Sequence, residues 1–394
     1  MKKILMICLL LVLVACARPP MPVTKPEDAL ERISWWRAVA PRDDREFKDV
    51  ATAAHQSLEY YKKLPSGTSF SFGREQVTAL DMVVTLQNFL LIVENDSLTA
   101  DQKVRQIKNE FVLYRSVGSN GKVLFTGYYE PVLACRLVAD DIYKYPLYRR
   151  PDDIIEIDLT LFGDSFPKDK IFGRLDHNKV IPYYSREEID KKQVIANRGL
   201  EMLWCNDPVA MYFLQVQGSG KVDLGDGNVV SVLYDGQNGR PYKSIGKYLI
   251  DGGFILKENM SMQAIREYLY AHLDDVFGIL NQNPSYVFFR MDMGPPLGSI
   301  GVPLTAGRSI ATDSRLFPKG ALALIATQKP VVENGAIKAW VPFTRFVLNQ
   351  DTGGAIKGPG RVDLFWGQGE EAEIGAGYMQ QKGELYFLMR KKSQ

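Results

Sequence analysis

A glycine-rich stretch near the C-terminus places two carboxylates on either side of one loop. It reads Gln350-Asp-Thr-Gly-Gly-Ala-Ile-Lys-Gly-Pro-Gly-Arg-Val-Asp363-Leu-Phe-Trp-Gly and carries Asp351, Lys357 and Asp363. Its glycines add no side chain to a core and cost chain entropy, so they indicate tight turns and close approach of a ligand. Asp363 opens an apolar run of three residues, which predicts a buried strand. We therefore expect an acid at a strand end beside an open loop, a position suited to chemistry.

The first residues predict export and attachment to a lipid. Two lysines precede the apolar run 4–15, which is too short to span a bilayer and has the length of a signal-peptide core. Cys16 follows directly after small residues, as in a bacterial lipoprotein signal. We expect residues 1–15 to be removed, Cys16 to be acylated, and the proline-rich residues 16–26 to form an extended tether. A plain secretory signal or an N-terminal membrane anchor is the alternative.

The residue after the lipidated cysteine gives an expectation for the location. Ala17 is not the aspartate that commonly retains lipoproteins in the inner membrane. We therefore expect a lipid-anchored protein of the outer membrane that faces the periplasm of a Gram-negative bacterium. In that oxidising compartment Cys135 and Cys205 could pair, but the sequence leaves open whether they form a disulfide or stay as buried thiols.

Charge and length narrow the class of protein. Loss of the two signal-peptide lysines would reduce the 48 basic residues to 46, equal to the 46 acidic ones. A neutral chain has no electrostatic footprint for nucleic acid, so we expect no nucleic-acid partner. A length of 394 residues with 46% hydrophobic residues predicts two domains.

The chain changes from a helical to a β-rich pattern along its length. Apolar periodicity predicts helices at 44–64 and 74–94, within a part that reads as helical from 27 to about 117. From 123 onward, many short strands are interrupted by Gly, Pro, Asn and Asp. One later helix is expected at 261–272, and a strand at 286–290.

The sequence lacks the motifs of metal sites, of nucleotide-binding loops and of the nucleophile elbow. The three histidines, His55, His177 and His272, are scattered, and no His or Cys pair has metal-ligand spacing. No Walker loop, dinucleotide fingerprint or nucleophile elbow is present, so we expect neither a metal nor a cofactor. Acids, aromatic residues and glycine loops remain, and together they are typical of a site that cleaves sugars.

Six motifs stand in a defined order along the chain. They are Thr126-Gly-Tyr-Tyr-Glu-Pro131, Tyr145-Pro-Leu-Tyr-Arg-Arg-Pro151, Phe213-Leu-Gln-Val-Gln-Gly-Ser-Gly220, Asn283-Pro-Ser-Tyr-Val-Phe-Phe289, Arg308-Ser-Ile-Ala-Thr-Asp313 and Asp351-Thr-Gly-Gly-Ala-Ile-Lys-Gly358. With these motifs the chain resembles the MltA family of lytic murein transglycosylases. The resemblance covers the chain from about Thr126 to the C-terminus, whereas the helical part before it matches only in general character.

The resemblance implies a mainly β fold with an N-terminal helical part. Its catalytic domain is expected to be a double-psi β-barrel, interrupted by a second, smaller inserted β-domain. On this basis residues 27–134 and 283–394 are the two parts of the barrel domain, and residues 135–282 are the inserted domain. The glycan is expected to lie in the groove between the two domains.

The resemblance also implies a reaction, which is cleavage of the β-1,4 bond between N-acetylmuramic acid and N-acetylglucosamine in peptidoglycan. The muramyl 6-hydroxyl attacks its own anomeric carbon and leaves a 1,6-anhydro sugar, so no water is added. The family's three aspartates map onto Asp313, Asp351 and Asp363. Asp363 is expected to act as the acid and then as the base, and Asp351 and Asp313 to support it, with Asp351 orienting the loop that carries Lys357. An acid of this kind needs an apolar site or a neighbouring carboxylate to stay protonated.

A further group of residues is expected to bind the glycan strand. They are Thr126, Tyr128, Glu130, Gln217, Ser219, Lys357 and Trp366. Alternate strand residues face opposite ways, so only one of Tyr128 and Tyr129 is expected to meet the glycan. Plainer alternatives are that the aromatic residues belong to the core, that Glu130 is a surface acid, and that Asp313 and Asp351 only form turns.

Two other functions remain open at this point. One is a conventional glycan hydrolase that uses two carboxylates and water, and the other is a glycan-binding lipoprotein without catalysis. The expected partners are peptidoglycan strands, the membrane through Cys16, and unidentified proteins of a wall-remodelling complex. The sequence does not distinguish endo from exo action, glycan length preference or oligomeric state.

Overall fold

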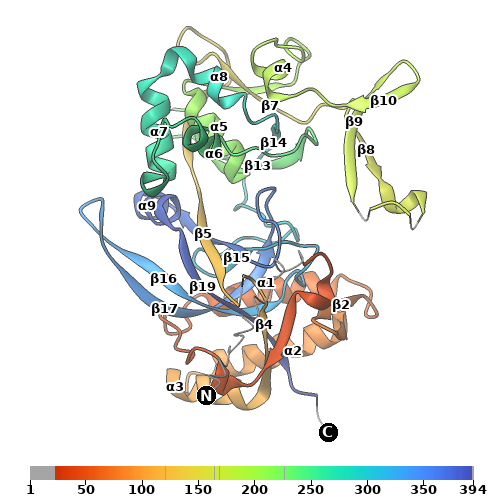
Figure 1. Cartoon of the computed structure of the whole chain (residues 1–394), viewed down its shortest axis with the longest axis vertical. Helices are drawn as coiled ribbons and strands as arrows, with labels where there is room; N and C mark the ends of the chain where they lie inside the picture. The colour runs from red at the N-terminus through yellow and green to blue at the C-terminus, as the bar shows by residue number, and fades with distance from the viewer. Residues whose placement is uncertain (1–22, 120, 164, 168, 226, 393–394) are drawn as a thin grey trace, which may run out of the picture.

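The computed structural model describes residues 23–392, except 120, 164, 168 and 226. The expected signal peptide and Cys16 therefore lie outside the described residues. In Figure 1 the N-terminal helices and the C-terminal strands share the lower part of the molecule. The middle of the chain, coloured yellow-green to teal, forms the upper part. Within the described residues, no helix has both the length and the apolar character needed to cross a membrane.

Six strands from distant parts of the chain close a barrel in the lower part. Around the ring they are β5 (Val123–Glu130), β19 (Gln381–Arg390), β16 (Leu322–Glu333), β17 (Ala336–Asp351), β15 (Ser309–Ala311) and β18 (Arg361–Gln368). The pairs β15–β17 and β18–β5 are parallel, and the others are antiparallel. The fold is therefore mainly β with a closed barrel, and the expected fold class is confirmed.

The part expected to be helical also contains strands. Its helices are α1 (Val50–Lys62), α2 (Ala79–Val93) and α3 (Ala100–Glu110). The expected helix at 74–94 begins only at residue 79, because Thr78 caps it by accepting the amide of Asp81. Residues before this cap form a hairpin of β2 (Ser69–Phe72) and β3 (Glu75–Thr78). Close to the end of this part, β4 (Phe111–Ser116) extends the barrel sheet by pairing with β19, and β1 (Leu30–Ile33) pairs with β4.

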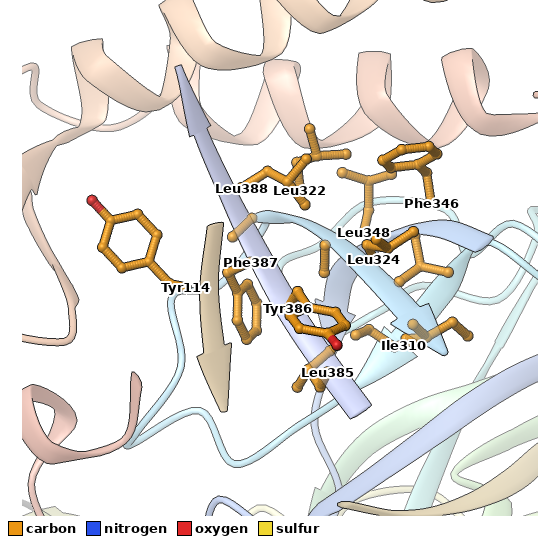
Figure 2. Packing of buried hydrophobic residues seen from close by; sticks show 14 of the residues in the cluster. Tyr114, Ile310, Leu322, Leu324, Phe346, Leu348, Leu385, Tyr386, Phe387 and Leu388 are labelled. Atoms are coloured by element: carbon orange, nitrogen blue, oxygen red, sulfur yellow. The ribbon is translucent and has the colours of Figure 1, made fainter. Parts of the chain in front are cut away.

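The barrel core is apolar and is covered by the N-terminal helices. Figure 2 shows Leu322, Phe346 and Leu388 between the strands and the helices that cross above them. Phe89 of α2 packs on Phe346 with ring centroids 5.6 Å apart. A fully buried ion pair also joins the two parts, because Arg308 Nη1 lies 2.6 Å from Asp43 Oδ2. These contacts fix the N-terminal segment against the strands that carry the acids.

The upper part is built on a second sheet of six strands. In spatial order they are β14 (Val287–Asp292), β13 (Val229–Gln237), β12 (Ser219–Asp223), β6 (Val132–Arg136), β11 (Glu201–Cys205) and β7 (Tyr145–Tyr148). The helices packed with them are α4 (Arg186–Asp190), α5 (Pro208–Gln217), α6 (Ile245–Asp251), α7 (Met262–Ala271) and α8 (Val276–Leu280). The helix expected at 261–272 and the strand expected at 286–290 correspond to α7 and β14.

Two local features complete the upper part. A smaller sheet of β8 (Ile155–Asp158), β9 (Lys170–Asp176) and β10 (Lys179–Pro182) projects to one side in Figure 1. Cys135 on β6 and Cys205 on β11 are directly opposite each other and form a disulfide. The sequence left this pairing open, and the antiparallel register decides it.

Candidate active site

Asp363 lies on strand β18 of the barrel wall, beside strand β5, which comes from a distant part of the chain. Strands β18 and β5 are parallel, and their register places Asp363 beside Thr126. The Thr126 hydroxyl donates a hydrogen bond to Oδ1 of Asp363. Arg361, two residues before Asp363, adds its Nε at 3.4 Å from the same oxygen. One carboxylate oxygen of Asp363 is thus held by two side chains.

The surroundings of Asp363 favour its protonated form. Burial raises the pKa of this carboxyl, although the charge of Arg361 and the Thr126 hydroxyl act in the opposite direction. The side chain of Asp363 is 17% exposed, so solvent or a ligand can reach it. Within the described part of the chain, Oδ2 accepts no hydrogen bond. Asp363 therefore combines a raised pKa with one unoccupied oxygen.

Asp351 belongs to the same cluster but has a different environment. Tyr128 on β5 donates to its Oδ2 at 2.9 Å. The backbone amides of Ser299 and Thr352 donate to its Oδ1 at 3.0 and 2.8 Å. Burial raises the pKa of Asp351 to about 6; these hydrogen bonds oppose the rise, and the nearby charge of Asp363 adds to it. Both oxygens of Asp351 are occupied by the protein.

Asp313 anchors the far end of the glycine-rich loop. Its carboxylate accepts hydrogen bonds from the Arg315 side chain and, at 2.8 Å, from the Gly358 amide. Burial alone would raise the pKa of Asp313, but these donors outweigh it and hold the pKa below its ordinary value. The loop that carries Lys357 is therefore held at both ends by an aspartate, Asp351 at its start and Asp313 at its end.

Lys357 extends from this loop into solvent. Its side chain is exposed, and within the described residues no hydrogen bond or ion pair involves its amine. The following Gly358 has a φ of +80°, a conformation that strains any residue with a side chain. The loop thus presents one cation on a backbone that requires glycine.

The two neighbouring tyrosines point in opposite directions, as expected from strand alternation. Tyr128 turns toward Asp351 and packs on Phe365, with ring centroids 5.1 Å apart. Tyr129 instead lies in a cluster with α9 (Glu370–Tyr378), where its hydroxyl accepts from Arg266 at 3.4 Å. Trp366 packs in the cluster of Tyr129, and its Nε1 is buried without a hydrogen-bond partner. The structure therefore gives Trp366 a packing position against α9.

Three other expected binding residues lie where β5 meets the upper part. Glu130 is 4% exposed, so the surface-acid alternative is wrong, and burial raises its pKa against the opposing charge of Lys221. Gln217 at the end of α5 uses its Oε1 to accept the Tyr129 amide at 3.1 Å. Ser219 begins β12 and is half-buried. Gln217 therefore has a structural contact that the sequence did not suggest.

Arg361 is the site residue that sequence reasoning missed. Strand parity could have found it, since residues i and i+2 on one strand share a face. In the described part of the chain, no three His, Cys, Asp or Glu side chains gather as a metal site. The site therefore consists of two perturbed carboxyls, a threonine, a tyrosine and an arginine.

Known proteins resemble this chain in sequence and in fold. The family model of the MltA specific insert domain matches residues 124–290, and that of the 3D domain matches residues 308–389. Membrane-bound lytic murein transglycosylase A of Escherichia coli K12 is 34% identical over 271 residues, which cover 68% of this chain and 66% of that protein.

Solved structures are similar over nearly the whole chain. A membrane-bound lytic murein transglycosylase from Agrobacterium tumefaciens is 30% identical, with a TM-score of 0.76, and the match covers 92% of this chain and 98% of that one. E. coli MltA with bound chitohexaose is 27% identical, with a TM-score of 0.68, and covers 95% and 100% of the two chains. The chain belongs to the family of membrane-bound lytic murein transglycosylase A.

Proposed function

We propose that this protein is a lytic murein transglycosylase. It cleaves the β-1,4 bond between N-acetylmuramic acid and N-acetylglucosamine in peptidoglycan and leaves 1,6-anhydro-muramyl ends. Family membership supports the class of activity, and the chitohexaose complex of the E. coli relative supports a glycan as the ligand. The role in the cell is turnover and remodelling of the wall.

The observation that carries the proposal is the state of Asp363. Its raised pKa favours the protonated acid, and its Oδ2 is free within the described structure. The acid donates its proton to the glycosidic oxygen as the bond from that oxygen to the anomeric carbon breaks. The muramyl 6-hydroxyl oxygen then bonds to the anomeric carbon, and its proton passes to the Asp363 carboxylate. Asp363 ends as it began, so one carboxyl suffices and no water is consumed.

Asp351 is assigned a supporting role in this mechanism. Two amides and the Tyr128 hydroxyl donate to its oxygens, so both oxygens of Asp351 are held by the protein, whereas Oδ2 of Asp363 has no such donor within the described residues. Its proposed task is to hold Tyr128 and the start of the glycine loop. Asp313 holds the end of that loop, and Lys357, Ser219 and Thr126 are the proposed contacts around the bound glycan.

The proposed domain organisation follows the family pattern. Residues 27–134 and 283–394 form the barrel domain, and residues 135–282 form the inserted domain above it. The glycan strand binds between them, close to β5, which links the two sheets. The proposed location is the outer membrane, with Cys16 lipidated and the enzyme in the periplasm. The word membrane-bound in the names of the relatives supports attachment to a membrane.

One observation favours a second candidate function. Asp351 has a pKa of about 6 and interacts electrostatically with Asp363, so the site holds two carboxyls of the kind that a conventional hydrolase uses. Digestion of purified peptidoglycan, followed by mass analysis of the muropeptides, separates the candidates. Anhydro ends support the transglycosylase, new reducing ends support the hydrolase, and intact glycan supports a binding protein.

A further inference from the structure

Arg361 connects the two side chains that meet at the proposed acid. Its Nη2 and Nε lie 3.1 and 3.3 Å from the Thr126 hydroxyl oxygen, and its Nε lies 3.4 Å from Oδ1 of Asp363. The Thr126 hydroxyl in turn donates to the same Oδ1. The side chain of Arg361 is 32% exposed, so it belongs to the wall of the site and not to the core.

We infer that Arg361 is a positioning residue for the reaction: together with Thr126 it holds Oδ1 of Asp363, so that the catalytic proton resides on Oδ2. This inference rests on the proposed function, because it concerns the acid of that reaction. To that function the inference adds a positioning residue, Arg361, and the assignment of the proton to Oδ2 of Asp363.

The donor count supports this assignment. A guanidinium has only donors, so Arg361 must donate to Thr126 and to Asp363. The hydroxyl oxygen of Thr126 accepts a hydrogen bond from Arg361. The single hydroxyl proton of Thr126 is then donated to Oδ1 of Asp363. Oδ1 thus receives donors from two sides and is a poor place for a further proton. A neutral Asp363 therefore carries its proton on Oδ2, the oxygen without a partner within the described residues.

The charge of Arg361 also sets how readily that proton leaves. Burial raises the pKa of Asp363, and Arg361 and Thr126 oppose this rise. The other groups that act on the cluster are Asp351 at the end of β17 and Tyr128 on β5. Tyr242 from the upper part is also within reach of the Arg361 charge. Arg361 carries the positive charge in this group. Its removal leaves the Asp363 carboxyl near Asp351 without that opposing charge.

The sign of the expected effect follows from these charges. Cleavage begins with protonated Asp363, so the rate falls as pH rises through the pKa of that carboxyl. A Leu at position 361 removes the charge that favours the carboxylate, so the pKa of Asp363 rises. An opposite charge at this distance changes a carboxyl pKa by about 1–3. The alkaline limb of kcat/KM should therefore move upward by about one pH unit or more.

The experiment compares Arg361→Leu with three other variants of the full chain. Arg361→Lys keeps the charge, Thr126→Val removes the hydroxyl without changing the shape, and Arg105→Leu replaces an exposed arginine on α3 as the control. Release of anhydro-muropeptides gives kcat and kcat/KM against pH. Carbon-13 NMR of labelled aspartates gives the pKa of Asp363 without any need for activity, with Asp363→Asn assigning the resonance.

The expected results distinguish positioning from simple binding. Arg361→Leu and Thr126→Val should raise the pKa of Asp363 and shift the limb upward, with a maximal rate lower by about tenfold or more because Oδ1 is no longer held. In Arg361→Lys the alkaline limb of kcat/KM should lie close to its wild-type pH, because the charge is kept. Arg105→Leu should match the wild type. If Arg361→Leu does not fold, Thr126→Val carries the same prediction.

Two results would overturn the inference. One is a pKa and a pH limb of Asp363 that stay unchanged in both Arg361→Leu and Thr126→Val. The other is a rise in KM alone, which would make Arg361 a residue that only binds glycan. Failure of the proposed function gives a different result, because the wild type would then release no anhydro products although the NMR titration remains measurable.

Discussion

The hydroxyl of Tyr128 lies 2.9 Å from Oδ2 of Asp351 and donates a hydrogen bond to it. This contact joins β5 to the end of β17. It occupies one oxygen of Asp351, a carboxyl whose pKa is raised by burial. Asp363, on the next strand, has one oxygen free within the described structure. The two carboxyls of the site are therefore unequal, and this difference leads to the first prediction.

Asp363→Asn should remove cleavage, whereas Asp351→Asn should leave measurable activity. A positioned general acid contributes roughly 10²- to 10⁴-fold to a rate, and an amide cannot supply that proton. The test is release of anhydro-muropeptides, with circular dichroism and thermal unfolding as controls for the fold. Equal and complete loss in a folded Asp351→Asn variant would favour the hydrolase with two carboxylates.

Stability should depend on pH through Asp351. Its pKa rises from 3.8 to about 6 on folding, so the folded state favours the neutral form. The stabilisation is therefore present below pH 3.8 and is lost as pH rises through 6, by at most roughly 3 kcal/mol. The free energy of unfolding of the wild type, measured in urea relative to Asp351→Asn, should fall between pH 4 and pH 7.

Asp313→Asn is the matched control for this measurement. Donors to Asp313 hold its pKa below 3.8, so its stabilisation is present above that pH and is lost toward acid. The difference between wild type and Asp313→Asn should therefore grow as pH rises from strongly acid values. A wild-type advantage over Asp351→Asn that also grows with pH would contradict the raised pKa of Asp351.

The sequence predicted the mainly β barrel through the resemblance and not through periodicity. Closing the ring requires β5 to pair with β19 and β18, which lie more than half the chain away. Periodicity reports only on local faces, so it could not give these pairings. The same limit explains why the helix expected at 74–94 begins only at residue 79. The apolar pattern of its first residues fits a strand as well as a helix, and the Thr78 cap fixes where the helix starts.

The acids of the site were found from the sequence, but their partners were not. Asp363 and Asp351 stand out because a glycine loop lies between them. Thr126, Tyr128 and Arg361 acquire their contacts only when β5 and β18 align in register. Gln217 was expected to bind glycan, yet its carbonyl accepts the Tyr129 amide, a contact that depends on how α5 meets β5.

Reduction of the disulfide between Cys135 and Cys205 should destabilise the protein. The bond closes a loop with a sequence separation of 70 residues in the upper sheet. Chain-entropy arguments give roughly 4 kcal/mol for a loop of this length. Unfolding in urea with and without a reductant should show this loss, and a Cys135→Ala, Cys205→Ala double variant should be insensitive to the reductant. An unchanged unfolding midpoint in the wild type would contradict the expected contribution.

Lipid attachment should depend on Cys16 alone. Cells grown with a fatty-acid analogue should label the wild type, while Cys16→Ala should take up no label because no other residue is expected to be acylated. Cys135→Ala is the control and should remain labelled. A wild-type protein that never takes up the label would exclude the lipoprotein assignment.

The central claim is that the muramyl 6-hydroxyl, and not water, attacks the anomeric carbon. Digestion of purified peptidoglycan in oxygen-18 water tests it most directly, with a hydrolytic muramidase as the positive control for label uptake. The account predicts products lighter than hydrolytic ones by one water, without heavy oxygen at the cleaved muramyl end. Stoichiometric incorporation of oxygen-18 at that end would show that solvent is the nucleophile and would contradict the account.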